Sequence, residues 1–236
     1  MSVLELRQIH KTYGQGEHQT RALDDISLTV DEGVLVAVMG PAGAGKSTLL
    51  SIAGTLEQPS SGELVIEGTD VASMSREDRA CLRRRTIGYV FQDASLLPGL
   101  TAVQNVALPM ELDGLSAHSA RLAGLAVLEA LGLGECAGCL PDELSGGERH
   151  LVAIARAFVG EHRLLLVDEP SGAVDDNGGA PAGPAGIRLV RAACQLGVAA
   201  VVVTHDARLA SLADRVIVLG NGRIVDDSVP SARARR

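Results

Sequence analysis

The sequence predicts an α/β protein with a mainly parallel β-sheet. Short β-rich runs alternate with helical patterns along the chain, which is the order typical of α/β folds. Three runs, at residues 34–39, 164–167 and 199–203, are continuously apolar and therefore indicate central strands buried on both faces. A glycine-rich segment directly follows the first run and opens a helical pattern. These observations predict a parallel sheet with a ligand site at its carboxyl edge.

The other elements follow from the same kind of pattern. Predicted strands cover residues 4–9, 26–30, 34–39, 63–66, 87–90, 164–167, 199–203, 215–219 and 223–225. The early strands, and the last two with their Asn221-Gly222 turn, are predicted to pair antiparallel. Residues 92–160 show no strand pattern, but leucines recur at helical spacing at positions 122, 125, 128 and 131. We expect a helical subdomain there, inserted into a core formed by residues 1–91 and 161–228.

Two segments depart from this regularity. Residues 176–186 are rich in Gly, Pro and Ala, so the next helix is predicted to begin only near Ile187. Residues 229–236 include Arg233, Arg235 and Arg236. We interpret this end as a disordered, solvated basic tail, with contact to anionic lipid as the alternative.

Composition narrows the class of protein. The 236 residues correspond to one large domain or two small ones. A hydrophobic content of 46% excludes disordered and collagen-like classes, and a net charge of −8 argues against nucleic acid as a partner. No apolar run approaches the roughly 18 residues of a membrane span, and charged residues in the first eleven positions argue against a signal peptide. We therefore expect a cytoplasmic protein.

Some residue types are rare. Two of the 21 basic residues are lysines, Lys11 and Lys46, and the four aromatic residues are Tyr13, Tyr89, Phe91 and Phe158. We interpret this scarcity as a coding bias toward Ala, Gly, Val and Arg. Cys136 and Cys139 form a CxxC pair, but no second pair completes a zinc site and the pair does not open a helix after a strand. Reduced thiols in a loop are the simpler interpretation.

The segment Gly-Pro-Ala-Gly-Ala-Gly-Lys-Ser at 40–47 fits G-x-x-x-x-G-K-[ST] between an apolar strand and a helix. Glycines let main-chain N–H groups turn toward phosphate oxygens, and the helix N-terminus adds partial positive charge. We expect Lys46 to reach the β- and γ-phosphates of a nucleotide and the Ser47 hydroxyl to ligate Mg²⁺. A dinucleotide fold is disfavoured because G-x-G-x-x-G is absent.

A second motif completes a nucleotide-hydrolysing site. The apolar run at 164–167 ends in Asp168 and Glu169, so both carboxylates are predicted to emerge at the carboxyl edge of the sheet. We expect Asp168 to hold Mg²⁺, directly or through water. Glu169 is the candidate general base that polarises the attacking water. Together with the phosphate loop, this pair predicts a P-loop NTPase.

The segment Leu-Ser-Gly-Gly-Glu at 144–148 precedes a helix and forms a second candidate anion site. A chain that binds one nucleotide has a use for a second phosphate site if two copies associate head to tail. The second site of each copy then caps the nucleotide of the other. With these motifs the sequence resembles the ATP-binding cassette (ABC) proteins. The resemblance implies one ATP-binding domain over residues 3–228, with a RecA-like mainly parallel core, an antiparallel β subdomain and an α-helical subdomain.

The resemblance also assigns roles to individual residues. Nucleotide-binding roles fall on Tyr13, Gly40, Pro41, Ala42, Gly43, Ala44, Gly45, Lys46, Ser47, Thr48, Ser145, Gly146, Gly147, Glu148 and Asp175. Catalytic roles fall on Lys46, Gln92, Glu169 and His205, and magnesium ligation on Ser47, Gln92 and Asp168. Tyr13 corresponds to the residue that stacks on adenine, Gln92 to the Q-loop glutamine beside the permease contact, Asp175 to the D-loop, and His205 to the switch histidine.

Four short sequence segments resemble those of the lipoprotein-releasing, macrolide-exporter and cell-division ATPases. They are residues 21–27, 91–98, 105–109 and 144–149. The resemblance implies ATP and Mg²⁺ as cofactors, a homodimer or cassette heterodimer, and an integral membrane permease whose inner face the chain binds peripherally. An exporter or extractor ATPase is the leading hypothesis. The ATPase module of a regulatory, mechanotransmitting membrane complex and a soluble non-transport ABC ATPase are the alternatives.

Three departures from the family pattern concern the site. His150 and Leu151 stand where the family usually has Gln and Arg, and residues 176–186 replace the start of a helix. These two departures put the ATPase rate and dimer affinity in question, while ATP binding is expected to survive. Ala42 and Ala44 replace residues that often carry hydroxyls, but the phosphate loop acts mainly through its backbone.

Overall fold

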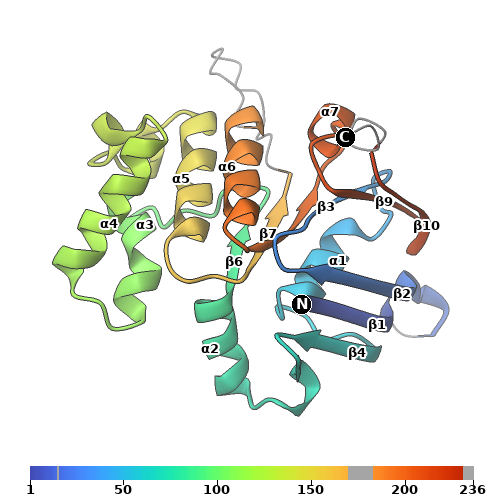
Figure 1. Ribbon diagram of the computed structural model, residues 1–236. Helices are drawn as coiled ribbons and strands as arrows, with labels where there is room; N and C mark the ends of the chain where they lie inside the picture. The colour runs from blue at the N-terminus through green and yellow to red at the C-terminus, as the bar shows by residue number, and fades with distance from the viewer. Residues whose placement is uncertain (15, 170–182, 231–236) are drawn as a thin grey trace.

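The structure is a computed structural model that describes residues 1–14, 16–169 and 183–230. The D-loop with Asp175 and the tail at 231–236 lie outside the described residues. Two β-sheets and a group of helices make up the fold (Figure 1). The α/β class with a mainly parallel core is confirmed, and so are the nine predicted strands as elements.

The larger sheet has six strands in the order β10-β9-β3-β8-β7-β6. Its members are β3 (Leu35–Met39), β6 (Ile87–Val90), β7 (Leu164–Asp168), β8 (Ala199–Val203), β9 (Arg215–Gly220) and β10 (Arg223–Ser228). All pairings are parallel except that between β9 and β10. Every residue of β7 and β8 is buried, as their continuous apolar runs predict.

The β9–β10 hairpin turns through Asn221 and Gly222, whose φ angles are 49° and 76°. Two consecutive positive φ values are those of a type I′ turn, which Asn-Gly favours because its twist matches that of paired strands. The antiparallel pairing predicted for this end of the chain is confirmed.

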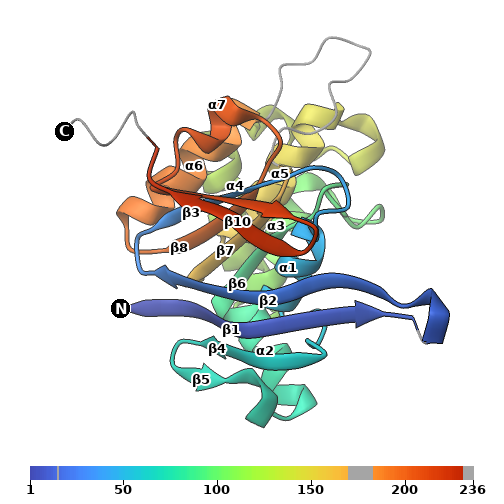
Figure 2. The ribbon, with the colours of Figure 1, turned by 90° about the vertical axis from the view of Figure 1, so that its right-hand side faces the viewer.

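The smaller, antiparallel sheet has the order β2-β1-β4-β5 (Figure 2). It consists of β1 (Ser2–Tyr13), β2 (Thr20–Asp31), β4 (Ser61–Ile66) and β5 (Thr69–Asp70). β1 runs four residues beyond its predicted end because it pairs with both β2 and β4. This extension carries Tyr13 to the neighbourhood of the phosphate loop. A shared apolar core joins this sheet to β3 and to the first helix.

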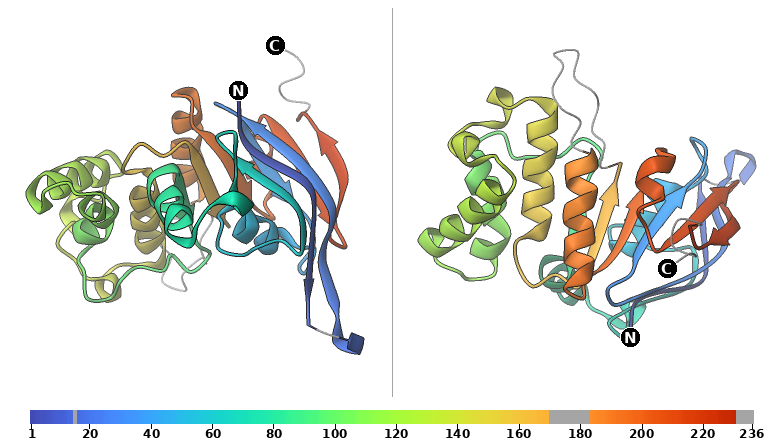
Figure 3. Two further views of the ribbon diagram at one scale, coloured as in Figure 1. Left: turned by 90° about the horizontal axis from the view of Figure 1, so that it is seen from below. Right: turned by 45° about the horizontal axis from the view of Figure 1, so that its top comes forward.

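Seven α-helices are described: α1 (Lys46–Ala53), α2 (Arg76–Thr86), α3 (Ala102–Leu112), α4 (Ala117–Ala130), α5 (Gly146–Phe158), α6 (Gly183–Gln195) and α7 (Ala207–Ala210). Helices α3, α4 and α5 pack against one another on one side of the larger sheet (Figures 1 and 3). Four helices begin at hydroxyl side chains that cap the first turn, namely Ser75, Thr101, Ser116 and Ser145.

The expected start of a helix near Ile187 is wrong, because α6 begins at Gly183. Pro184 falls in the first turn of α6, where a helix has no use for the missing N–H. Within the described residues, no helix is both long enough and apolar enough to cross a bilayer.

Candidate functional site

The predicted site residues follow four neighbouring parallel strands at one edge of the larger sheet. β3, β8, β7 and β6 are adjacent in that order and in parallel register. The phosphate loop at 40–47 follows β3, His205 follows β8, Asp168 ends β7 and Gln92 follows β6. Since carboxyl ends of parallel strands meet at one edge, the fold brings these groups together.

The backbone of the phosphate loop requires glycine at two positions. A Cβ on Gly40 would lie 2.3 Å from the carbonyl oxygen of Leu219, and one on Gly45 would lie 2.4 Å from that of Ala22. Gly45, with φ 100°, is the N-cap of α1 and supplies no side-chain hydrogen bond, and the first turn carries no acidic residue. Unlike the four helices capped by Ser or Thr, α1 therefore begins with main-chain N–H groups that suit an anion.

The Lys46 side chain, at the end of the phosphate loop, hydrogen-bonds the backbone at the start of the same loop. Its Nζ donates hydrogen bonds to the carbonyl oxygens of Gly40 at 2.8 Å and Pro41 at 2.9 Å. The ammonium group is thus held over the loop, on the side where the N-terminus of α1 opens. Any phosphate bound there meets a lysine that is already positioned.

Ser47 and Asp168 join the loop to the end of β7. The Ser47 hydroxyl lies where it can donate a hydrogen bond to the Asp168 carboxylate. Burial raises the pKa of Asp168, the negative charge of Glu169 adds to this, and the Ser47 hydrogen bond and the positive charge of Lys46 oppose it. A hydroxyl and a carboxylate that face each other are oxygen ligands of the kind that Mg²⁺ prefers, so these two residues fit that ion.

Glu169 and His205 form a pair at the same edge. Oε2 of Glu169 lies 2.9 Å from Nδ1 of His205. The Glu169 side chain is 17% exposed, whereas that of His205 is 76% exposed, so the histidine covers the carboxylate from the solvent side. Glu169 has φ 50°, a left-handed conformation that is rare for this residue type, and its N–H donates to the Val203 carbonyl at 3.0 Å. Backbone strain of this kind is concentrated at functional sites.

Tyr13 is the last residue of β1 and lies beside the start of α1. Its hydroxyl hydrogen-bonds the Thr48 side chain and donates to Oε2 of Glu57 at 2.6 Å. Burial raises the pKa of Tyr13 and the bond to Glu57 adds to this, so the phenol stays protonated. With 40% of the residue exposed, part of the ring remains open beside the phosphate loop.

Gln92 lies in an exposed turn directly after β6. Ala94 and Ser95, two and three residues further on, have positive φ values, and the half-buried guanidinium of Arg156 on α5 donates to their carbonyl oxygens at 3.0 and 2.9 Å. Arg156 therefore ties the segment after Gln92 to α5. This contact spans about sixty residues of sequence and has no local pattern that could have revealed it.

Residues 145–148 lie on a different part of the molecule. Ser145 and Glu148 form a capping box at the start of α5, in which the Ser145 main-chain N–H and hydroxyl each lie 2.8 Å from Oε2 of Glu148. The main contacts of α5 are with α3, α4, α6 and β6, whereas those of α1 are with β1, β2, β7 and β8. One chain therefore does not bring residues 145–148 to its own phosphate loop.

His150 joins α5 to the carboxylate pair. The residue is 3% exposed, and its ring lies where an N–H can donate a hydrogen bond to the main-chain carbonyl of Glu169. Burial lowers the pKa of His150, while that hydrogen bond and the charge of Asp93 oppose the shift. Among the described residues, Nε2 of His150 has no hydrogen-bond partner. The sequence marked position 150 as a departure from the family pattern but not as a contact of Glu169.

Tyr89 on β6 lies beneath the same site. Burial and the negative charge of Asp168 raise the pKa of Tyr89 to about 12, against a hydrogen bond from Ser51. Its ring stacks on that of Phe91 with centroids 4.3 Å apart. Two of the four aromatic residues thus support the strand that leads to Gln92.

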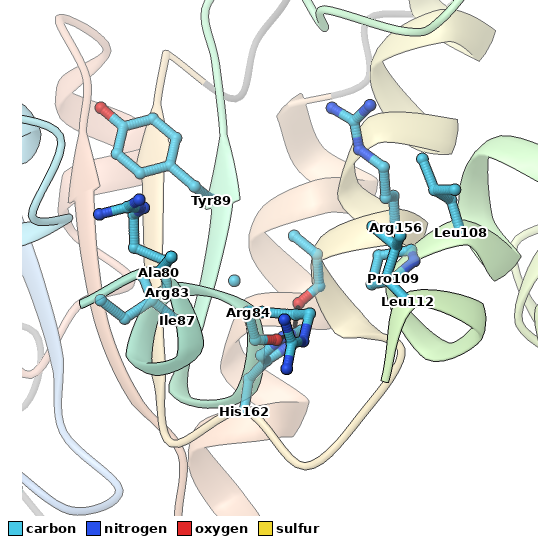
Figure 4. A pocket seen from close by; sticks show the side chains of 12 residues that line it. Ala80, Arg83, Arg84, Ile87, Tyr89, Leu108, Pro109, Leu112, Arg156 and His162 are labelled. Carbon is cyan, nitrogen blue, oxygen red and sulfur yellow. Dashed lines mark hydrogen bonds between the residues drawn. The ribbon is translucent and has the colours of Figure 1, made fainter. Parts of the chain in front are cut away.

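A hollow of about 330 Å³ lies where β6 and α2 face α3 and α5. Figure 4 shows Arg83 and Arg84 of α2 around this hollow together with Tyr89, Pro109 and Arg156. Its lining combines apolar surface with three arginines, and it shares Tyr89 with the strand that ends before Gln92. We refer to this hollow as the β6–α3 groove.

Comparison with known proteins agrees with this geometry. Residues 23–172 match the family model described as ABC transporter. The chain is 42% identical to the lipoprotein-releasing system ATP-binding protein LolD of Shewanella oneidensis, covering 93% of this chain and 94% of that one. It is 38% identical to the macrolide export ATP-binding/permease protein MacB of Photorhabdus laumondii over 96% of this chain, but spans only 34% of that protein.

A solved dimeric ATP-binding cassette in a post-hydrolysis state, bound to ADP and Pi, superposes with a TM-score of 0.88. It shares 35% identity with this chain, and the match covers 96% of this chain and 98% of that one. The family model and the LolD relative each cover enough sequence to settle the family, and membership implies ATP binding and hydrolysis. The chain belongs to the ABC transporter family.

Proposed function

We propose that the chain is the ATP-hydrolysing subunit of a membrane transporter of the exporter or extractor type. The observation that carries this proposal is the meeting of the phosphate loop, Asp168 and the Glu169–His205 pair at one sheet edge. Residues 3–228 act as one ATP-binding domain whose helical part, residues 92–160, is inserted into the core. The names of two relatives, a lipoprotein-releasing system ATP-binding protein and a macrolide export ATP-binding/permease protein, support the link to transport.

Each group has a distinct role in the proposed reaction. Main-chain N–H groups of the phosphate loop and the ammonium of Lys46 bind the β- and γ-phosphates of ATP. Ser47 and Asp168, with Gln92 at the same edge, would hold Mg²⁺, which neutralises charge on the phosphates. Glu169 orients and deprotonates the attacking water, and His205 contacts the γ-phosphate from the open side.

The functional unit is a head-to-tail dimer. Residues 145–148 of one copy cap the nucleotide held by the phosphate loop of the other, because a single chain keeps these two segments apart. Asp175 contributes to the same interface in this proposal, as its resemblance to the D-loop implies. The dimeric state of the related solved cassette supports this arrangement.

The β6–α3 groove is the proposed contact with the permease, and the chain would bind that membrane protein from the cytoplasmic side. The groove is lined by Tyr89 on β6, the strand that leads to Gln92, and by Arg156, which ties Ala94 and Ser95 to α5. Movement of a permease element in the groove therefore reaches both Gln92 and the helix that carries residues 145–148.

Two measurements test this function. The purified chain should release phosphate from Mg-ATP, and Lys46→Ala should lose ATP binding. The tagged chain should also retain a permease when it is purified from native membranes. Leu112→Arg, at a residue that lines the groove and is 64% exposed, should abolish that retention. The matched variant Leu122→Arg, at a 56% exposed leucine on α4, should leave it intact. A chain that hydrolyses ATP but retains no membrane partner would contradict the transport role.

A further inference from the structure

One of the two lysines has no part in the function proposed above. Lys46 belongs to the phosphate loop, but Lys11 lies on β1, two residues before Tyr13. Residues two apart on a strand project from the same face, so the two side chains are neighbours. The Lys11 side chain is only 16% exposed, which is unusual for a lysine.

Lys11 makes three contacts at this place. Its Nζ lies 5.0 Å from the centroid of the Tyr13 ring, donates to the carbonyl oxygen of Gln58 at 2.8 Å, and lies 3.1 Å from Oε2 of Glu57. A lysine ammonium has three N–H donors on a compact head, which suits such a crowded site better than the planar fork of arginine.

Glu57 completes the arrangement from the segment that follows α1. The same oxygen, Oε2, is the one that accepts the hydrogen bond of the Tyr13 hydroxyl. Hydrogen bonds from Tyr13 and then from Lys11 hold the pKa of Glu57 below its usual range, so its charge persists at neutral pH. The Tyr13 ring is therefore fixed at its hydroxyl by Glu57 and Thr48, and faced by a cation.

We propose that Lys11 and Glu57 are positioning residues that hold Tyr13 as the stacking surface for the adenine base of ATP. This inference rests on the proposed ATP site and deepens it. An aromatic ring on the end of a strand loses rotational freedom when a base stacks on it, and a ring that is held beforehand loses less. The lysine also attracts the ring through its π-face. Neither residue belongs to the phosphate loop at 40–47, so both act on recognition of the base alone.

Nucleotide binding by full-length variants tests this inference. Lys11→Met and Glu57→Gln should each raise the Kd for ATP about three- to fivefold, in line with the strength of cation–π contacts at partly exposed sites. Each should raise KM for ATP without changing kcat. The Kd for inorganic tripolyphosphate, which has no base, should stay within twofold of wild type. Lys11→Arg, which keeps the cation but not the compact head, should recover part of the affinity.

The control is Arg7→Met, which removes a positive charge from the same strand at an exposed ion pair with Glu5 and Glu63. It should leave ATP and tripolyphosphate binding unchanged. Unchanged ATP affinity in both Lys11→Met and Glu57→Gln would overturn the inference. So would an equal loss of ATP and tripolyphosphate affinity, because the two residues would then merely maintain the fold. Failure of the wild-type chain to bind either ligand would instead contradict the proposed function.

Discussion

Glu169 and His205 meet at 2.9 Å although they lie 36 residues apart and follow different strands. The pairing of β7 with β8 places Asp168 beside Val203, so the residues that come next leave the sheet side by side. The left-handed backbone of Glu169 then turns its carboxylate toward the imidazole. A carboxylate near the phosphate loop and covered by a histidine is well placed to act on a water molecule.

Glu169→Gln should reduce kcat for ATP hydrolysis by about 100-fold or more, because general bases typically contribute factors of 10² to 10⁴. Glutamine has nearly the same shape and keeps a polar contact with His205, so the Kd for ATP should stay within about threefold. With hydrolysis blocked, the ATP-bound dimer should accumulate in size-exclusion chromatography with light scattering. Undiminished turnover by this variant would refute the role of Glu169 as base.

His205→Ala tests the other half of the pair. The His205 side chain is 76% exposed, so its removal leaves the core unchanged and should not lower the free energy of unfolding by more than about 0.5 kcal/mol. We expect kcat to fall about 10- to 100-fold while ATP binding is retained, since the loss is confined to the step in which charge develops on the γ-phosphate. Phosphate release and thermal unfolding, measured side by side, separate these effects. A loss of stability with unchanged kcat would assign His205 a structural role.

Elements with a residue pattern that repeats along the chain could be predicted from the sequence. Elements that exist only because they pair with another strand could not. β3, β7 and β8 were evident because both faces are buried and each run is apolar throughout. β5 has two residues, too few for any periodicity, and exists only because β4 pairs with it. The Gly- and Pro-rich composition of residues 176–186 predicts a helix start near Ile187, but α6 begins at Gly183, because a helix tolerates a proline in its first turn.

The candidate site divides in the same way. Residues that bind through a fixed local spacing, such as Lys46 and Ser47, are marked by their motif. No motif marks Glu57 or Arg156, because their partners are distant in the sequence. Glu57 is 44 residues from Tyr13, and Arg156 is 61 residues from Ser95. Their contributions depend on how β1, α1 and α5 are packed, which no short segment encodes.

His150 is buried on α5 beside Glu169, so its replacement should affect both the free energy of unfolding and kcat. His150→Ala should lower the free energy of unfolding by about 2 kcal/mol, because it opens space beside α5 and removes a donor that faces the Glu169 carbonyl. It should also lower kcat by disturbing Glu169. His150→Gln, which restores the residue usual in the family, can donate to the same carbonyl and should match wild type in both respects. Urea unfolding and phosphate release give the two readouts, and equal behaviour of both variants would exclude this hydrogen bond as the cause.

We expect His162 to make the free energy of unfolding depend on pH. Its ring nitrogens lie 3.0 Å from the Ala157 carbonyl oxygen and 3.2 Å from that of Arg84, which links the end of α5 to α2. Burial lowers the pKa of His162, although hydrogen bonds to those carbonyls and the charge of Asp113 oppose it. The folded state therefore binds fewer protons than the unfolded state at pH values between the lowered pKa and about 6.5.

The stability associated with neutral His162 is present above pH 6.5 and is lost as the pH falls below it. The free energy of unfolding in urea should drop by on the order of 1 kcal/mol between pH 7.5 and pH 5.5. Carboxylates whose pKa is lowered by arginines, such as Asp113 and Asp227, do not titrate in this window and lose their contribution only in stronger acid. His162→Gln keeps a donor for one carbonyl and should show a smaller drop, with the remainder due to buried His150. If the variant and the wild type lose the same free energy over this range, His162 is not the group that titrates.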